Sequence, residues 1–141
     1  MKDKVLLSSF LAAVIVFVFS PAFSVTASID ESLPTVNPER ITVGPQVYPA
    51  QLVNLKHRGF SVIINNRPEG EEETQPSTKD LKLEAESLGL DFYHIPVSPL
   101  GINKENIDAL VNALASTSAP VFAFCRSGTR SNKLKNSLRE L

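Results

Sequence analysis

The sequence is poor in several residue types, and each shortage excludes a class of protein. Its 141 residues are enough for one domain and hold a single cysteine, so no internal disulfide can form. This cysteine and the two histidines show no metal-ligand spacing, which excludes a structural zinc site. The net charge of −1 lacks the basic excess that nucleic-acid binding requires. We therefore expect no metal, no cofactor and no nucleic-acid partner.

The first 27 residues have the pattern of an export signal. Lys2 and Lys4 precede an apolar run over residues 5–19, and residues 25–27 offer a small-residue cleavage site. This pattern is typical of a secretory signal peptide. The apolar run is shorter than the roughly 20 residues of a membrane-spanning helix, and an uncleaved segment is the alternative, as an N-terminal anchor that holds the domain at a membrane. Both interpretations predict an exported domain, periplasmic or extracellular.

The rest of the chain is predicted to form a linker and one domain. Residues 28–39 contain two prolines and little apolar periodicity, which favours a linker. Residues 40–141 alternate apolar runs, typical of strands, with amphipathic stretches, typical of helices. This alternation predicts a small α/β domain, in which helices flank a four-stranded, mainly parallel sheet. The predicted strands are residues 41–43, 60–64, 91–97 and 120–124, and the predicted helices begin near residues 49, 77, 103 and 131.

The single cysteine lies where such folds bind ligands, at the carboxyl end of a strand. Cys125 is followed by a short polar loop that leads into the last helix. Backbone N–H groups in such a loop bind anions and stabilise a thiolate. This predicts Cys125 as a nucleophile and Arg130 as the side chain that closes over the anion, whereas a buried structural cysteine is the alternative. The other predicted members of the anion-binding loop are Arg126, Ser127, Gly128, Thr129 and Ser131.

A second arginine ends the strand over residues 60–64 on the same predicted rim. Two interpretations of Arg67 stay open: it lines the anion pocket, or it pairs with the acidic residues of the loop over residues 68–76. The acidic cluster in that loop is itself expected to be solvated.

Residues 44–46, 62–71 and 125–131 together carry a family resemblance. They resemble the phosphatase-like domain found with beta-lactamase-hydrolase-like proteins, a family with the protein-tyrosine-phosphatase type of fold. The segment over residues 125–131 is the most specific, and the resemblance implies that Cys125 is the nucleophile and Arg130 the anion clamp. Family members often have histidine before the cysteine, where this chain has Phe124.

Two chemistries use a loop of this kind, and the sequence slightly favours sulfur transfer. Four residues separate Cys125 from Arg130, as in the Cys-Arg-x-Gly-x-Arg loop common in rhodaneses, whereas tyrosine phosphatases place five there. The segment over residues 97–103, where those phosphatases carry a general acid, has no Asp or Glu. The favoured prediction is a sulfurtransferase that forms a persulfide on Cys125 from a sulfane-sulfur donor. The alternatives are a phosphomonoester hydrolase with a phosphocysteine intermediate, and a non-catalytic module that binds an anion or a partner.

Overall fold

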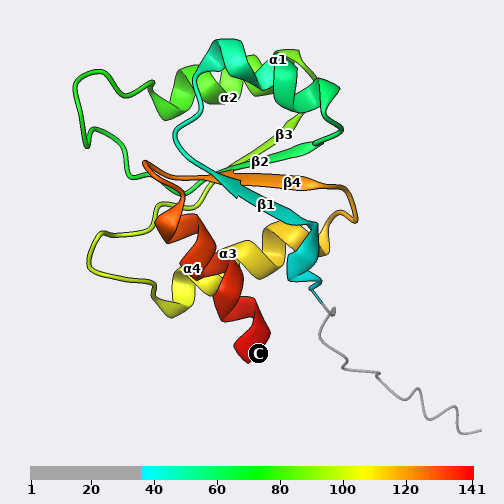
Figure 1. Cartoon of the computed structure of the whole chain (residues 1–141), viewed down its shortest axis with the longest axis vertical. Helices are drawn as coiled ribbons and strands as arrows, with labels where there is room; N and C mark the ends of the chain where they lie inside the picture. The colour runs from blue at the N-terminus through cyan, green and yellow to red at the C-terminus, as the bar shows by residue number, and fades with distance from the viewer. Residues whose placement is uncertain (1–35) are drawn as a thin grey trace, which may run out of the picture. The chain divides into compact units, whose positions relative to one another are not determined.

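A four-stranded sheet forms the middle layer of the domain, with helices on both of its faces (Figure 1). The strands lie in the order β1 (Ile41–Gly44), β4 (Val121–Phe124), β2 (Val62–Asn65) and β3 (Asp91–His94). Every neighbouring pair is parallel, which confirms the predicted α/β fold. The computed structural model describes residues 36–141, so the predicted signal or anchor over residues 1–27 and most of the predicted linker lie outside the described residues.

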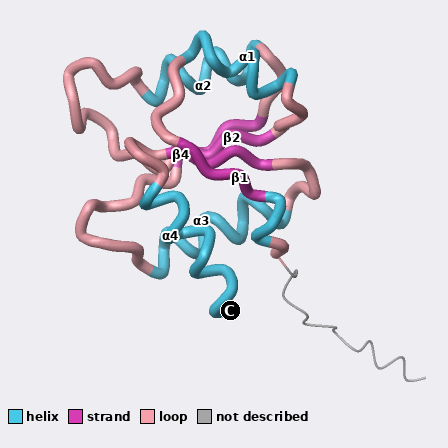
Figure 2. The backbone as a smooth tube through the Cα atoms, in the orientation of Figure 1, coloured by secondary structure: helices cyan, strands magenta, loops and turns pink. Residues whose placement is uncertain are grey.

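Two helices cover each face of the sheet (Figure 2). Helices α1 (Pro49–His57) and α2 (Thr78–Ser87) pack on one face, and α3 (Lys104–Ala115) and α4 (Thr129–Ser137) pack on the other. None of the helices within residues 36–141 is long and apolar enough to cross a membrane. Two short 3-10 turns, η1 (Pro38–Arg40) and η2 (Leu138–Glu140), lie at the two ends of the described chain.

The hydrophobic core consists of two clusters, one on each side of the sheet. Val62 and Ile64 of β2 face α3 and α4, whereas Ile63 faces α1 and α2, because successive strand side chains point to opposite faces. All four residues of β2 and of β4 are buried, as expected for the central strands of a parallel sheet. This rigid centre holds the carboxyl ends of β2 and β4 side by side.

Most strand boundaries differ from the sequence prediction by one to three residues, and the start of the last helix differs by two. The last helix begins at Thr129 rather than near residue 131, because Gly128 caps it with a φ of 91° that favours glycine. The third strand ends at His94 rather than at residue 97. Beyond this end, the backbone N–H groups of Ile95 and Val97 donate to the carbonyl oxygens of Asn65 and Asn66, at 2.9 Å each.

The end of the predicted linker contacts the domain. Val36 packs against the core cluster under α3 and α4, and the Asn37 side chain accepts a hydrogen bond from the Glu39 N–H at 2.9 Å. Arg40 donates to carbonyl groups at the end of α3, among them that of Leu114 at 2.5 Å. These contacts fix the chain where it enters β1.

Candidate active site

Cys125 lies at the centre of the carboxyl edge of the sheet, directly after β4. The register aligns Phe124 of β4 with Gly44 of β1 and Asn65 of β2, so the segments that follow all three strands surround the cysteine. The cysteine is 1% exposed, and its Sγ accepts a hydrogen bond from the Gly128 N–H at 3.1 Å. A Cβ on Gly128 would lie 3.1 Å from the Gly44 carbonyl oxygen, so the loop needs glycine for space as well as for its backbone angle.

The backbone of this loop stabilises the Cys125 thiolate. Burial is the largest influence on the thiol and by itself would raise its pKa. Hydrogen bonds from the N–H groups of Ser131, Arg130, Ser127 and Gly128 oppose burial, and together they lower the pKa of Cys125 below its usual value of 9.0. The N–H groups of the loop therefore converge on the sulfur atom, which favours its ionised, nucleophilic form.

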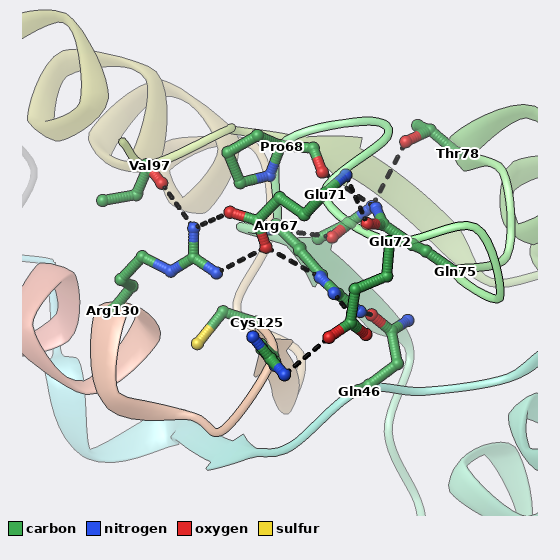
Figure 3. A network of polar contacts seen from close by, with 12 residues as sticks. Gln46, Arg67, Pro68, Glu71, Glu72, Gln75, Thr78, Val97, Cys125 and Arg130 are labelled. Carbon is green, nitrogen blue, oxygen red and sulfur yellow. Dashed lines mark hydrogen bonds and ion pairs between the residues drawn. The ribbon is translucent and has the colours of Figure 1, made fainter. Parts of the chain in front are cut away.

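The Arg130 guanidinium binds a glutamate from the loop between β2 and α2 (Figure 3). Its Nη1 and Nη2 donate to the two carboxylate oxygens of Glu71 at 2.6 and 2.9 Å, and Nη1 also donates to the Val97 carbonyl at 3.1 Å. The hydrogen bond to Glu71 is the main reason that the pKa of Arg130 is raised, burial opposes it, and interaction with Cys125 adds to it. Arg130 thus lies beside the cysteine, with its orientation set by Glu71.

The Arg67 side chain belongs to the same polar network. It is 2% exposed, and its Nε donates to Glu71 at 2.8 Å while Nη1 donates to the Gln46 side-chain oxygen at 2.8 Å. Its Nη2 lies 2.9 Å from an oxygen of Glu72. Of the two interpretations of Arg67, the structure shows the pairing with the acidic loop, and it places this pairing next to the cysteine loop.

The expectation of a solvated acidic loop is wrong for two of its members. Glu71 is 20% exposed and bridges Arg67 and Arg130. Its hydrogen bond from Arg130, partly opposed by burial and helped by Arg67, lowers its pKa to about 2. Glu72 bridges Arg67 and Arg126 as an ion pair with each, and its interaction with Arg67 is the first cause of its lowered pKa. Both glutamates are therefore ionised at neutral pH and have no proton to donate.

The remaining predicted loop residues take different positions. Arg126 is exposed, and its Nη2 lies 2.5 Å from Glu72. The hydroxyl groups of Ser127 and Thr129 lie 3.0 Å apart on the surface. The Ser131 hydroxyl is buried and has no hydrogen-bond partner among the described residues. Glu71 and Glu72 are the site residues that the sequence prediction missed. The signal for them was the presence of Arg67 and Arg130 shortly after β2 and β4, because two nearby arginines need acidic partners.

Residues 36–141 contain no group of three or more His, Cys, Asp or Glu side chains that could hold a metal ion. The segment over residues 97–103 turns back on itself through a bridge between Ser98 and Gly101, and its Asn103 caps α3 by accepting from the Asn106 N–H at 2.9 Å. Figure 3 shows the carbonyl of Val97 in this segment directed at Arg130. This segment therefore supports the arginine through its backbone.

These features define a class: a parallel α/β domain with a cysteine in the loop that opens a helix at the carboxyl edge of the sheet, and an arginine beside it. A family model described as "Beta-lactamase hydrolase-like protein, phosphatase-like domain" matches residues 33–138. The chain belongs to this family, and its phosphatase-like fold agrees with the resemblance drawn from residues 44–46, 62–71 and 125–131.

Curated relatives are much longer than this chain. It is 41% identical over 92 residues to a beta-lactamase hydrolase-like protein of Agrobacterium fabrum, and 36% identical over 92 residues to one of Xylella fastidiosa. Each match covers 65% of this chain and 21% of the relative. The chain therefore spans about a fifth of the length of these relatives.

Solved structures of similar fold carry phosphatase names. A putative phosphatase from Neisseria meningitidis is 33% identical with a TM-score of 0.64, and the match covers 70% of each chain. A putative phosphatase from Shewanella putrefaciens is 20% identical with a TM-score of 0.62, covering 71% of this chain and 62% of that one. The core catalytic domain of a PP-IP phosphatase from S. cerevisiae is 17% identical with a TM-score of 0.54, covering 72% and 60%. The last two comparisons show the fold alone.

Proposed function

We propose that this domain hydrolyses phosphomonoesters through a covalent phosphocysteine on Cys125. The sequence slightly favours sulfur transfer, but membership of a phosphatase-like family and the likeness to a putative phosphatase at 33% identity support the hydrolase alternative better. The observation at the site that carries the proposal is the Cys125 sulfur in its loop, where it accepts from the Gly128 N–H at 3.1 Å, where loop N–H groups lower its pKa, and where Arg130 lies beside it. A thiolate nucleophile and donors for anionic oxygens are the two things this reaction needs.

The reaction takes two displacement steps. The Cys125 thiolate attacks phosphorus, so that an S–P bond forms while the P–O bond to the leaving group breaks. Water then attacks phosphorus, the S–P bond breaks, and phosphate leaves with the thiolate restored. A guanidinium has five N–H donors, and Glu71 and Val97 take three of those of Arg130. The other two, on Nε and Nη2, are not used by Glu71 or Val97 and serve the phosphoryl oxygens.

The ionised glutamates restrict the leaving group. General acid catalysis contributes about 100- to 10,000-fold to reactions of this kind, yet Glu71 and Glu72 are both held as carboxylates. The best substrates are therefore esters whose leaving group is stable as an anion, such as aryl phosphates. We expect alkyl phosphates to react at least about 100-fold more slowly than aryl phosphates.

Sulfur transfer is the second candidate, and the spacing of the loop favours it. Four residues separate Cys125 from Arg130, and the convergence of N–H groups on the sulfur suits a thiolate or a terminal persulfide sulfur. In this reaction the thiolate attacks the outer sulfur of thiosulfate, an S–S bond forms, and sulfite leaves with the electron pair of the broken bond. A thiol or cyanide acceptor then removes the outer sulfur. Sulfite needs no proton to leave, so the lack of Asp and Glu over residues 97–103 is no obstacle.

Purified protein and its Cys125→Ser variant distinguish these candidates. The assays are phosphate release from an aryl phosphate, thiocyanate formation from thiosulfate and cyanide, and intact mass after exposure to each donor. The proposal predicts phosphate release that needs Cys125, with a mass gain of one phosphoryl group trapped at low pH. Thiocyanate formation with a one-sulfur mass gain, and no phosphate release, would replace it by the second candidate. If the folded wild-type protein shows neither activity, only the non-catalytic binding module is left. Urea unfolding of the Cys125→Ser variant shows whether it is folded.

For the N-terminal segment, we propose that residues 1–27 direct the domain out of the cytoplasm. The support is the basic start, the apolar run over residues 5–19 and the small residues before Ser28. Cell fractionation of the full chain and of a variant lacking residues 2–27 tests it. Export that needs the segment, with a mature mass beginning at Ser28, is the expected result. An exported protein of full-length mass would instead support the anchor, and cytoplasmic full-length protein would contradict both.

A further inference from the structure

A second group of charges lies on the rim of the cysteine loop, next to the Glu71 network. Glu72 joins two arginines there: its Oε1 lies 2.5 Å from Nη2 of Arg126, and its Oε2 lies 2.9 Å from Nη2 of Arg67. We propose that Arg126 and Arg67 form a second anion subsite, which the Glu72 carboxylate occupies and which a second anionic group of the substrate takes over. The inference rests on the proposed function only in that Cys125 is the reacting thiolate.

The buried Arg67 supplies the first argument for a ligand. Its Nη2 carries positive charge in a side chain that is 2% exposed, yet it has no well-directed hydrogen bond within the described residues. The Glu72 carboxylate neutralises this charge from 2.9 Å, without a well-directed hydrogen bond to Nη2. Buried donors without an acceptor are costly. An anion that accepts a linear hydrogen bond from Nη2 would therefore be bound more strongly there than the Glu72 carboxylate.

The exposure of the rim pair supplies the second argument. The side chain of Arg126 is 66% exposed and that of Glu72 is 37% exposed. The side chain of Glu71 is 20% exposed, and both of its carboxylate oxygens accept hydrogen bonds from Arg130. An ion pair as exposed as Arg126 with Glu72 contributes little to stability, so an incoming anion can replace it. The neighbouring glutamates therefore have different roles. Glu71 orients Arg130, whereas the Glu72 carboxylate occupies the subsite until an anionic group of the substrate displaces it.

The position of Arg126 places the second anionic group of the substrate near the reacting one. It follows Cys125 directly, and its carbonyl oxygen accepts a hydrogen bond from the Gln46 N–H at 3.2 Å, which ties the backbone of the loop to the segment after β1. Its side chain therefore extends from the residue next to the reacting sulfur. We expect a substrate with a phosphate or carboxylate group close to the group that reacts with Cys125.

Protection of Cys125 from iodoacetamide tests the subsite without any turnover. The probes are methylphosphonate, with one anionic group, and methylenediphosphonate, with two, and neither can be hydrolysed at phosphorus. The variants are Glu72→Gln, Arg126→Gln and, as the matched control, Glu73→Gln, which removes the same charge from the same loop but takes part in no ion pair within the described residues. The half-protecting concentration of each probe is measured for each protein.

The subsite predicts a pattern across probes and variants. Glu72→Gln lowers the half-protecting concentration of methylenediphosphonate by about two- to fivefold, Arg126→Gln raises it, and methylphosphonate changes less in both. Equal effects of Glu72→Gln and Glu73→Gln, or equal shifts for the two probes, would overturn the subsite, since general electrostatics would then account for them. If neither probe protects wild-type Cys125, the anion site of the proposed function fails as well, so the two failures are distinguishable.

Discussion

Replacing Glu71 by glutamine tests the central electrostatic link of the site. The Glu71 carboxylate accepts hydrogen bonds from Arg130 at 2.6 and 2.9 Å and from Arg67 at 2.8 Å. Glutamine keeps the shape of the side chain and one accepting oxygen but removes the negative charge. The variant therefore leaves two partly buried guanidinium groups without their shared carboxylate, and we expect a less stable protein.

The pKa of Glu71 gives the size of this loss. A fall from 4.5 to about 2 corresponds to about 3 kcal/mol of preference for the ionised form, at about 1.4 kcal/mol for each pKa unit. The side chain is 20% exposed, so solvent screening reduces the expected loss to about 2 kcal/mol. Because the folded-state pKa is lowered, this stabilisation is complete above about pH 4.5 and is lost as the pH falls towards 2.

Urea unfolding at several pH values measures the effect. At pH 7, Glu71→Gln lowers the free energy of unfolding by about 2 kcal/mol, and at pH 3 the difference from wild type shrinks to less than half of that. Glu73→Gln, from the same loop, is the control and changes the stability by less than about 0.5 kcal/mol. A Glu71→Gln protein as stable as wild type at pH 7, or a difference that does not shrink in acid, would refute the reasoning.

Three further outcomes follow from the hydrogen bonds and packing around Cys125. The rate of Cys125 alkylation by iodoacetamide, measured against pH, should rise with an inflection below pH 9.0, because the loop N–H groups lower the thiol pKa; an inflection at or above 9.0 contradicts this. Gly128→Ala, which forces a Cβ into a φ of 91° near Gly44, should cost about 1–2 kcal/mol of stability in urea unfolding. Gly44→Ala, whose Cβ would overlap the Phe122 ring, should cost about 1–3 kcal/mol by overpacking, and wild-type stability in either variant would contradict the packing described for it.

The element order of the fold could be predicted from local sequence, but the order of the strands could not. Apolar runs over residues 60–64 and 120–124 identify β2 and β4 as buried strands, because burial on both faces requires apolar residues at every position. Such a run says nothing about which strand lies next to it. The early start of α4 was also missed, because its cap is the left-handed backbone of Gly128 rather than a Ser or Thr side chain.

The cysteine loop was easier to find than its charged partners. Residues 125–131 are contiguous, so the strand, the cysteine and the helix start can be recognised in one stretch. Glu71 lies 59 residues from Arg130, and an acidic cluster in a loop ordinarily indicates solvent exposure. The pairing becomes predictable only once β2 is known to lie beside β4, because the loops that follow these two strands then meet.

The charges that meet there nearly cancel, and the balance constrains what the site can bind. The network combines three cations, Arg67, Arg126 and Arg130, with two anions, Glu71 and Glu72. One positive charge is left over, and the Cys125 thiolate neutralises it. Every anionic group of a substrate therefore adds negative charge that the intact network does not offset, and a second anionic group makes this excess larger. A substrate with two such groups binds well only if one carboxylate gives way, and Glu72 is the more exposed and more weakly held of the two.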